Sequence, residues 1–163
     1  MLINLKNKDT LVLDDFNFKC SIGKNGTKIR KTEGDKTTPT GLFSLGKFYY
    51  RADRVKRPTT KIPIKIIKKN MGWCDDSNSQ YYNSEIKVND NIKHEKLFRK
   101  DSNYDYLIVI NYNTKRIRTL KGSAIFIHLT KNYKKTAGCI ALRKKDFLIM
   151  AKLINKKTKI KIY

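Results

Sequence analysis

The 163-residue sequence contains little proline, glycine or cysteine, with 3, 8 and 3 of these residues respectively. It therefore lacks the composition of collagen-like chains, of proline- or glycine-rich disordered chains and of small disulfide-bonded scaffolds. Its longest apolar runs, such as residues 107–110 and 124–127, are far shorter than the ~20 residues of a membrane-spanning helix. The length and the 39% of hydrophobic residues indicate one folded domain over residues 1–163.

Acidic residues are scarce, because 14 Asp and Glu stand against 37 Lys and Arg, and the formal net charge is +23. Such a charge favours an anionic partner. Only 8 of the cations are Arg, whereas specific recognition of phosphates or bases favours the bidentate guanidinium. AT-rich codon usage also produces lysine, so the composition leaves open whether the charge is functional. We expect adhesion to anionic wall polymers or membrane surfaces through Lys, and no specific nucleic-acid partner.

The chain has only two histidines, His94 and His128, and three widely spaced cysteines, Cys20, Cys74 and Cys139. No CxxC pair occurs, so neither a zinc site nor a disulfide framework is expected, although a Cys20–Cys74 bridge stays open. We expect His94 at the surface. The first 20 residues contain no apolar stretch of signal-peptide length, so we read the chain as leaderless.

Short apolar segments separated by polar turns predict a mainly β fold. The expected strands are residues 2–5, 10–13, 16–22, 42–50, 62–67, 106–111, 124–128 and 159–163, with a further strand around Ile117. A turn-rich loop is expected over residues 23–41. Residues 51–103 otherwise have no clear period and read as an excursion over the core.

One segment has the spacing of an amphipathic helix. Within residues 146–155, Phe147, Met150, Ala151 and Ile154 occur at positions i, i+3, i+4 and i+7. We therefore predict one helix near the C-terminus.

The pair best suited to nucleophilic chemistry is Cys139 with His128. His128 ends an apolar segment, so a rigid strand would hold its imidazole as a general base. Gly138 directly precedes Cys139, and a glycine lets backbone N–H groups approach a substrate oxygen closely. A thiol becomes a good nucleophile when a neighbouring imidazole takes its proton. The residues alone leave open a purely structural role for both side chains.

Several segments resemble the L,D-transpeptidase catalytic domains of the YkuD-like family. Residues 123–128 (SAIFIH), a short basic loop and residues 136–142 (TAGCIAL) resemble the family signature. Residues 33–43 resemble its Thr-Pro-x-Gly turn, and residues 20–23 and 72–76 resemble segments of a short single-domain branch. The resemblance implies a twisted β-sandwich or barrel-like sheet with one helix near the C-terminus.

The resemblance implies L,D-transpeptidation of peptidoglycan stem peptides, without metal or cofactor. Cys139 would attack the donor carbonyl to form a thioester, and His128 would take the thiol proton and pass it to the leaving amine. Backbone N–H groups around Ala137, Gly138 and Cys139 would stabilise the oxyanion, and an amine acceptor would resolve the thioester. L,D-carboxypeptidase hydrolysis at the same site, or a non-enzymatic basic binding module, are the alternatives. The family implies a periplasmic or cell-wall location, and we expect a monomer.

Further site residues follow from the same resemblance. The common signature has His in place of Ala137 and often Arg in place of Ala141, so Arg143 becomes the candidate carboxylate anchor. The candidate substrate-binding residues are Thr136, Ala137, Arg143, Trp73 and Tyr112. Thr136 would either bond the active-site loop or cap a turn.

Packing is the alternative role for both Trp73 and Tyr112. Asp75 and Asp76 could interact with a cationic group of the substrate, or could stabilise a turn or cap. Leu129 follows His128, so we expect a backbone carbonyl rather than a side chain to orient the imidazole.

Overall fold

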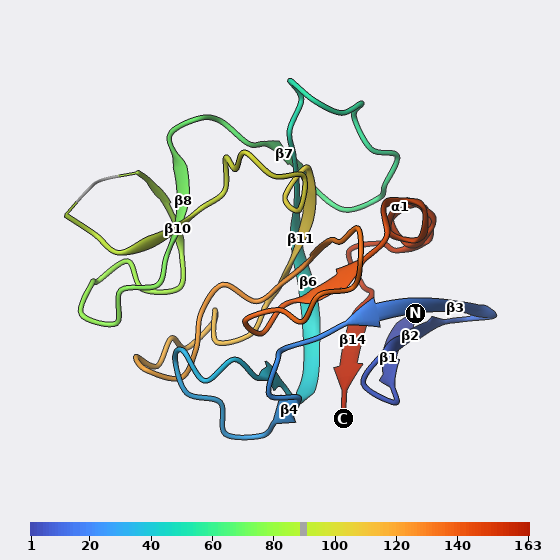
Figure 1. Ribbon diagram of the computed structural model, residues 1–163, viewed down its shortest axis with the longest axis horizontal. Coiled ribbons are helices and arrows are strands. Elements are labelled where there is room, and N and C mark those ends of the chain that lie inside the picture. Colours follow the sequence, from blue (N-terminus) through green and yellow to red (C-terminus); the bar gives the residue numbers. More distant parts are fainter. Residues whose placement is uncertain (89–90) are drawn as a thin grey trace.

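The computed structural model describes residues 1–88 and 91–163 and is dominated by one closed sheet (Figure 1). Among these residues, nine strands pair in the order β11-β12-β13-β3-β2-β1-β14-β6-β7, and β11 also pairs with β6, which closes a barrel. Its strands are β1 (Leu2–Lys6), β2 (Thr10–Leu13), β3 (Phe16–Ser21), β6 (Gly41–Tyr50), β7 (Ile64–Ile66), β11 (Tyr106–Ile110), β12 (Phe126–Leu129), β13 (Ile140–Leu142) and β14 (Lys159–Ile162). The mainly β prediction is confirmed.

The barrel strands follow the two-residue period of a sheet with one buried face. Ile3 and Leu5 of β1 and Leu11 and Leu13 of β2 point inward, and less buried residues alternate with them. By contrast, β11 and β12 are buried along their whole length, because other elements cover both of their faces. β14 lies between β1, to which it is parallel, and β6, to which it is antiparallel.

The predicted helix is confirmed as α1 (Lys144–Leu153), which begins two residues earlier than expected. Phe147, Met150 and Ala151 are buried on its inner face, and Ile154 is buried directly after it. The Phe147 ring packs edge-on against Phe48 of β6, with the ring centroids 5.5 Å apart. No helix in the described part of the chain has the length and apolar character needed to cross a membrane.

The middle of the chain contains strands that the sequence did not predict. β8 (Met71–Cys74) pairs with both β9 (Glu85–Lys87) and β10 (His94–Lys96) in a second, three-stranded sheet. In Figure 1 this small sheet and α1 lie on opposite sides of the barrel. The Trp73 ring packs edge-on against Phe126 of β12 at 5.2 Å, so the small sheet covers the outer face of β12. Two short strands, β4 (Thr27–Lys28) and β5 (Thr38–Pro39), pair separately.

Two local predictions need correction. Ile117 is not in a strand: the Asn113 side-chain amide donates to the carbonyls of Arg118 and Gly122 and holds this segment as a loop. His94 is half-buried rather than a surface residue, because it lies in β10 and faces Cys74 of the neighbouring strand β8.

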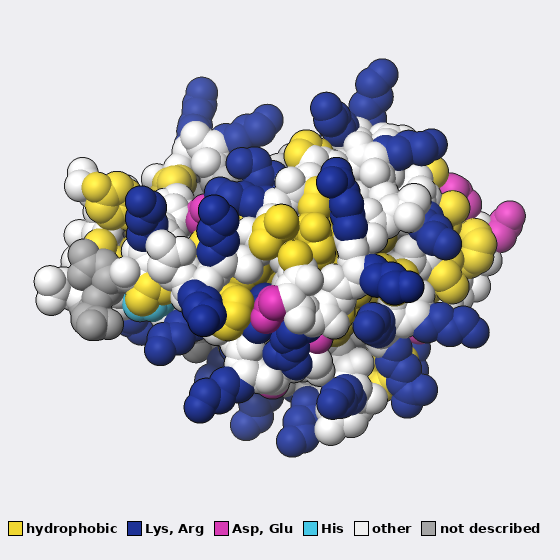
Figure 2. All heavy atoms as spheres, turned by 90° about the horizontal axis from the view of Figure 1, so that it is seen from above, with side chains coloured by type: hydrophobic (Ala, Val, Ile, Leu, Met, Phe, Trp, Pro, Cys, Tyr) yellow, Lys and Arg dark blue, Asp and Glu magenta, His cyan; other side chains and the backbone are white. Residues whose placement is uncertain are grey.

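Cys20 and Cys74 are both buried and free in the described part of the chain. The charge is spread widely over the surface. Figure 2 shows Lys and Arg side chains scattered across the whole of one face, with few Asp or Glu between them.

Candidate active site

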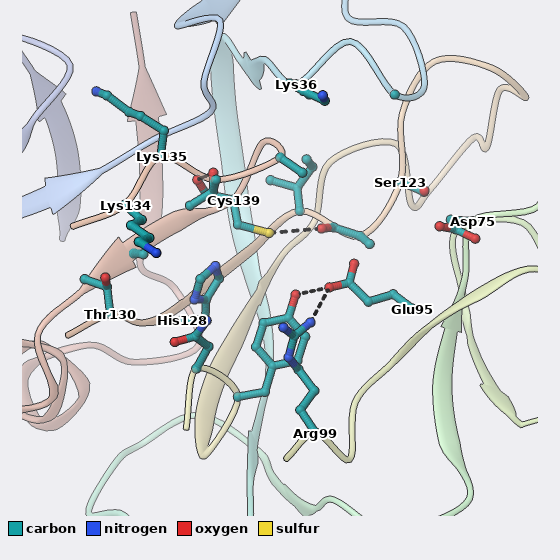
Figure 3. Close-up of a pocket in the computed structure, with 18 of the residues that line it drawn as sticks. Lys36, Asp75, Glu95, Arg99, Ser123, His128, Thr130, Lys134, Lys135 and Cys139 are labelled. Atoms are coloured by element: carbon teal, nitrogen blue, oxygen red, sulfur yellow. Dashed lines mark hydrogen bonds and ion pairs between the residues drawn. The ribbon is translucent and has the colours of Figure 1, made fainter. Parts of the chain in front are cut away.

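The register of two neighbouring strands brings the predicted nucleophile and base together. β12 and β13 are parallel, and His128 lies opposite Ala141. Cys139 precedes β13 and is two residues from Ala141, so strand alternation places it on the same face as His128. Figure 3 shows the imidazole of His128 pointing toward the Cys139 thiol.

Backbone groups hold the Cys139 thiol. Its Sγ donates to the Ala124 carbonyl at 3.2 Å and accepts from the Phe126 N–H at 3.3 Å. Burial, and next the charge of Glu95, raise the pKa of the Cys139 thiol to about 12. The resting thiol is therefore protonated at neutral pH and would need a base in order to act as a nucleophile.

The His128 ring is also oriented by backbone, as the sequence predicted. Its Nδ1 lies 2.8 Å from the carbonyl oxygen of Leu129. A carbonyl can only accept, so Nδ1 carries the hydrogen and Nε2 keeps a lone pair that can take a proton. The Tyr104 ring packs edge-on against the imidazole at 5.2 Å. Burial lowers the pKa of His128 to about 4, so the resting imidazole is neutral.

The loop before Cys139 requires glycine and is tied to two distant segments. Gly138 has φ +146°, and a Cβ there would lie 2.8 Å from the Thr37 carbonyl oxygen. The Thr38 hydroxyl donates to the Gly138 carbonyl at 2.8 Å and accepts from the Gly23 N–H at 2.9 Å. The segments at residues 20–23, 33–43 and 136–142 thus meet beside the thiol, although they are far apart in the sequence.

Thr136 bonds the active-site loop. Its hydroxyl donates to the Cys139 carbonyl at 2.6 Å and accepts from the Gly138 N–H at 3.1 Å. Its own N–H donates to the Ile22 carbonyl at 3.0 Å, which links the loop to the end of β3. Thr136 therefore fixes the backbone that carries Cys139.

The thiol and the imidazole open into a cavity of about 620 Å³ with charged walls. Its cationic lining residues are Lys31, Lys36, Lys93, Arg99, Lys134 and Lys135. Its acidic lining residues are Glu33, Asp75 and Glu95. In Figure 3, Lys134 and Lys135 lie on the Cys139 side of the cavity, whereas Asp75 and Glu95 lie across from it.

The acidic wall comes from the small sheet and its neighbours. Glu95 of β10 accepts a hydrogen bond from the Tyr104 hydroxyl and lies 3.7 Å from the Arg99 guanidinium. Burial raises the pKa of Glu95. Asp75 directly follows β8; its Oδ1 is buried without a hydrogen-bond partner among the described residues, and burial raises its pKa.

A third acid, Glu33, is anchored beside this wall. Glu33 Oε2 accepts from the Tyr82 hydroxyl and from the Ser123 hydroxyl, the latter at 2.7 Å. Since Ser123 leads directly into Ala124, these contacts tie the loop at Glu33 to the segment that accepts the thiol hydrogen bond.

The candidate substrate-binding residues divide into two groups. Thr136 and Ala137 line the cavity. Trp73 is not among the lining residues; it is buried, and its Nε1 donates to the Asn83 Oδ1 at 2.9 Å. Tyr112 lines a separate groove, and the Arg143 guanidinium lies over the Tyr133 ring at 5.2 Å.

The sequence analysis missed several cavity residues, among them Lys31, Glu95 and Tyr104. Lys31 is buried, and its Nζ is paired with Asp35 Oδ1 at 2.7 Å. The spacing of four residues between these opposite charges was the one available signal for Lys31. Glu95 lies in the stretch without a clear period and Tyr104 directly follows it, so only the fold brings them to the cavity.

A cavity-facing thiol beside a neutral imidazole, both carried by a closed β-barrel, defines a Cys–His site. The chain matches the YkuD family, described as the L,D-transpeptidase catalytic domain, over residues 1–162. It therefore belongs to the YkuD family, whose substrate is peptidoglycan. No curated protein matches the chain.

Proposed function

We propose that the protein is an L,D-transpeptidase that transfers an acyl group between peptidoglycan stem peptides through a thioester on Cys139. The supporting observation is the placement of Cys139 and His128 on one face of two adjacent parallel strands, at the wall of a charged cavity. We place the activity in the periplasm or cell wall, where peptidoglycan lies.

The chemistry starts from two neutral groups. As Sγ of Cys139 attacks the donor carbonyl, its proton passes to Nε2 of His128, and a tetrahedral oxyanion forms. Collapse breaks the peptide bond, and His128 returns the proton to the leaving amine, so the terminal amino acid departs and the thioester remains. An amine acceptor then attacks the thioester, loses its proton to His128, and regenerates the thiol with a new amide bond.

Stabilisation of the oxyanion is assigned to the backbone just before the nucleophile. The Gly138 N–H already donates to Thr136, so the N–H groups of Ala137 and Cys139 are the remaining candidates in this segment. The role of Gly138 is then to allow the backbone geometry, through its positive φ, rather than to donate to the substrate.

The charged walls suggest how a stem peptide is oriented. Lys134 and Lys135 line the cavity on the Cys139 side, so they take the carboxylate-anchoring role that the sequence gave to Arg143. Asp75, whose buried Oδ1 has no hydrogen-bond partner in the described chain, is proposed to accept a hydrogen bond from an amine on the donor side chain. The two walls would therefore fix the ends of a peptide that carries both charges.

The direct test is intact-protein mass spectrometry of the enzyme mixed with a tetrapeptide donor. We expect an adduct whose mass equals the donor minus its terminal amino acid, located on Cys139 by peptide mapping. Cys139→Ala should show no adduct and no turnover. Cys20→Ala, which removes another buried thiol, should retain both. Full turnover by Cys139→Ala would refute the proposal.

An acceptor experiment separates transfer from hydrolysis. With a second stem peptide or a free D-amino acid present, a transpeptidase yields an amide product in competition with the hydrolysed tripeptide. Product that is solely hydrolysed at every acceptor concentration would make the protein an L,D-carboxypeptidase at the same site.

A further inference from the structure

A second surface feature lies beside the cavity, and the proposed chemistry does not use it. A groove of about 630 Å³ has Phe43 and Tyr112 among its lining residues. Its exposed cationic residues are Arg30, Arg116, Arg118 and Lys121. Three of the chain's 8 arginines therefore gather at this one place. We call these four cations and the groove between them the basic groove.

The cations of the basic groove have no acidic partners. Within residues 1–88 and 91–163, none of the four lies within ion-pair distance of a carboxylate. Two arginines outside the basic groove differ: Arg51 is paired with Asp53 at 2.8 Å, and Arg99 with Asp101 at 2.7 Å. The basic groove therefore presents uncompensated guanidinium groups, which suit phosphate ligands.

Exposed aliphatic side chains alternate with these cations along the sequence. Ile29, next to Arg30, is 82% exposed; Ile117, between Arg116 and Arg118, is 45% exposed; Leu120, next to Lys121, is 57% exposed. A polyanion such as nucleic acid or a wall polymer gains nothing from exposed aliphatic groups. A bilayer surface binds both kinds of side chain favourably, because aliphatic groups enter the interface while cations contact the anionic headgroups.

The loop that carries this feature is held in shape by its own hydrogen bonds. The Arg118 N–H donates to Asn113 Oδ1 at 2.8 Å, and the Asn113 amide donates back to the Arg118 carbonyl at 2.9 Å. The Glu33 N–H donates to the Leu120 carbonyl at 2.8 Å, which fastens the loop to the segment that carries Ile29. The exposed cations and the exposed aliphatic side chains are therefore held together in place, and binding does not have to order the loop first.

We propose that the basic groove, with Ile29, Ile117 and Leu120 around it, docks the protein on an anionic phospholipid bilayer. The arginines contact headgroup phosphates, and the three aliphatic side chains enter the interface. Lys31 lines both the basic groove and the cavity of Cys139. Docking therefore places the cavity close to the membrane surface. This inference does not depend on the proposed chemistry.

The test is co-sedimentation of the full chain with vesicles that contain about one third phosphatidylglycerol in phosphatidylcholine, at about 0.1 M salt. The charge variant is Arg116→Glu/Arg118→Glu, and its control is Lys68→Glu/Lys69→Glu, which changes the net charge equally elsewhere. The apolar variant is Ile29→Ser/Leu120→Ser, and its control is Leu2→Ser/Ile66→Ser, at exposed sites of the same residue types. Thermal unfolding of each variant checks that it is folded.

We expect the charge variant to weaken vesicle binding at least about tenfold and its control to change it by less than about twofold. The apolar variant should weaken vesicle binding several-fold, while its binding to soluble heparin stays unchanged. Equal losses in the charge variant and its control would overturn the proposal in favour of general charge. If the apolar variant binds vesicles like the unmodified protein, the basic groove serves a soluble polyanion and not a bilayer. Absence of vesicle binding by the unmodified protein would also overturn it.

Discussion

The two walls of the cavity are built in different ways. On the barrel side, backbone groups hold the proposed nucleophile and base: the Ala124 carbonyl and the Phe126 N–H contact the Cys139 thiol, and the Leu129 carbonyl contacts His128. On the side of the small sheet, side chains hold one another, as where the Tyr104 hydroxyl donates to Glu95.

This difference teaches where sequence change is tolerated. Contacts to backbone persist when neighbouring side chains vary, so the reactive pair depends on its own two residues and on the strand register. Contacts between side chains disappear with a single substitution. We therefore expect the barrel side to set the rate of the reaction and the small-sheet side to set the choice of substrate.

The largest expected effect is on the barrel side. His128→Gln removes the base while keeping the side-chain volume similar, and turnover at neutral pH should fall on the order of 10²–10⁴-fold. His94→Gln, on the small sheet and outside the cavity lining, should be nearly silent. Steady-state kinetics with a tetrapeptide donor measures both. Equal losses would mean that the wrong histidine has been assigned as the base.

The second effect is on folding. Because burial lowers the pKa of His128 from 6.5 to about 4, the unfolded chain binds more protons than the folded chain between these values. Stability should therefore fall as pH decreases from about 6.5 to about 4, by roughly 3 kcal/mol from this group. His128→Gln should lose this share of the pH dependence, and His94→Gln should keep it. Urea unfolding at pH 7 and pH 4 provides the comparison.

Gly138→Ala tests the backbone on the barrel side. The new Cβ would lie 2.8 Å from the Thr37 carbonyl at a φ that alanine avoids, so stability should drop by about 1–3 kcal/mol. Gly26→Ala is the matched control, because its φ is +78° but nothing lies within 4 Å of the new Cβ. The larger loss should belong to Gly138, and activity should fall with it. A larger loss at Gly26 would show that φ, and not the contact, sets the cost.

The smallest effect is expected from the small-sheet side. Asp75→Asn should raise KM several-fold for donors with a side-chain amine and leave donors without that amine unchanged, with kcat nearly constant. Asp76→Asn, one residue further on and outside the cavity lining, is the control. A fall in kcat comparable to that of His128→Gln would erase the distinction between the two walls.

The barrel and its helix were predictable because their patterns are long enough to read. Residues 146–155 show a full helical period, and residues 2–5 and 10–13 are short apolar segments bounded by polar turns. The small sheet was not predictable, since β9 (EIK) and β10 (HEK) have only three residues each and are largely polar. The burial of Trp73 against Phe126 stabilises that sheet, and this contact exists only once the barrel is formed.

The site was predictable to the same extent. Cys139, His128 and the Leu129 carbonyl could be inferred because they lie on or beside barrel strands. Arg143 could not be placed correctly from distance along the chain, because α1 begins immediately after it and directs it over Tyr133 rather than toward the cavity. Glu95 reaches the cavity because β10 pairs with β8, and no local sequence pattern predicts that pairing.

The position of β14 has a consequence for the order of events during synthesis. Residues 159–162 lie between β1 and β6, so β1 gains this neighbour only after β14, more than 150 residues further along the chain, has been made. Until then the barrel is an open sheet with two unpaired edges. Pairing between such distant segments carries a large loop-closure entropy and is slow. Cys139 and His128 are therefore made before the barrel that holds them can close.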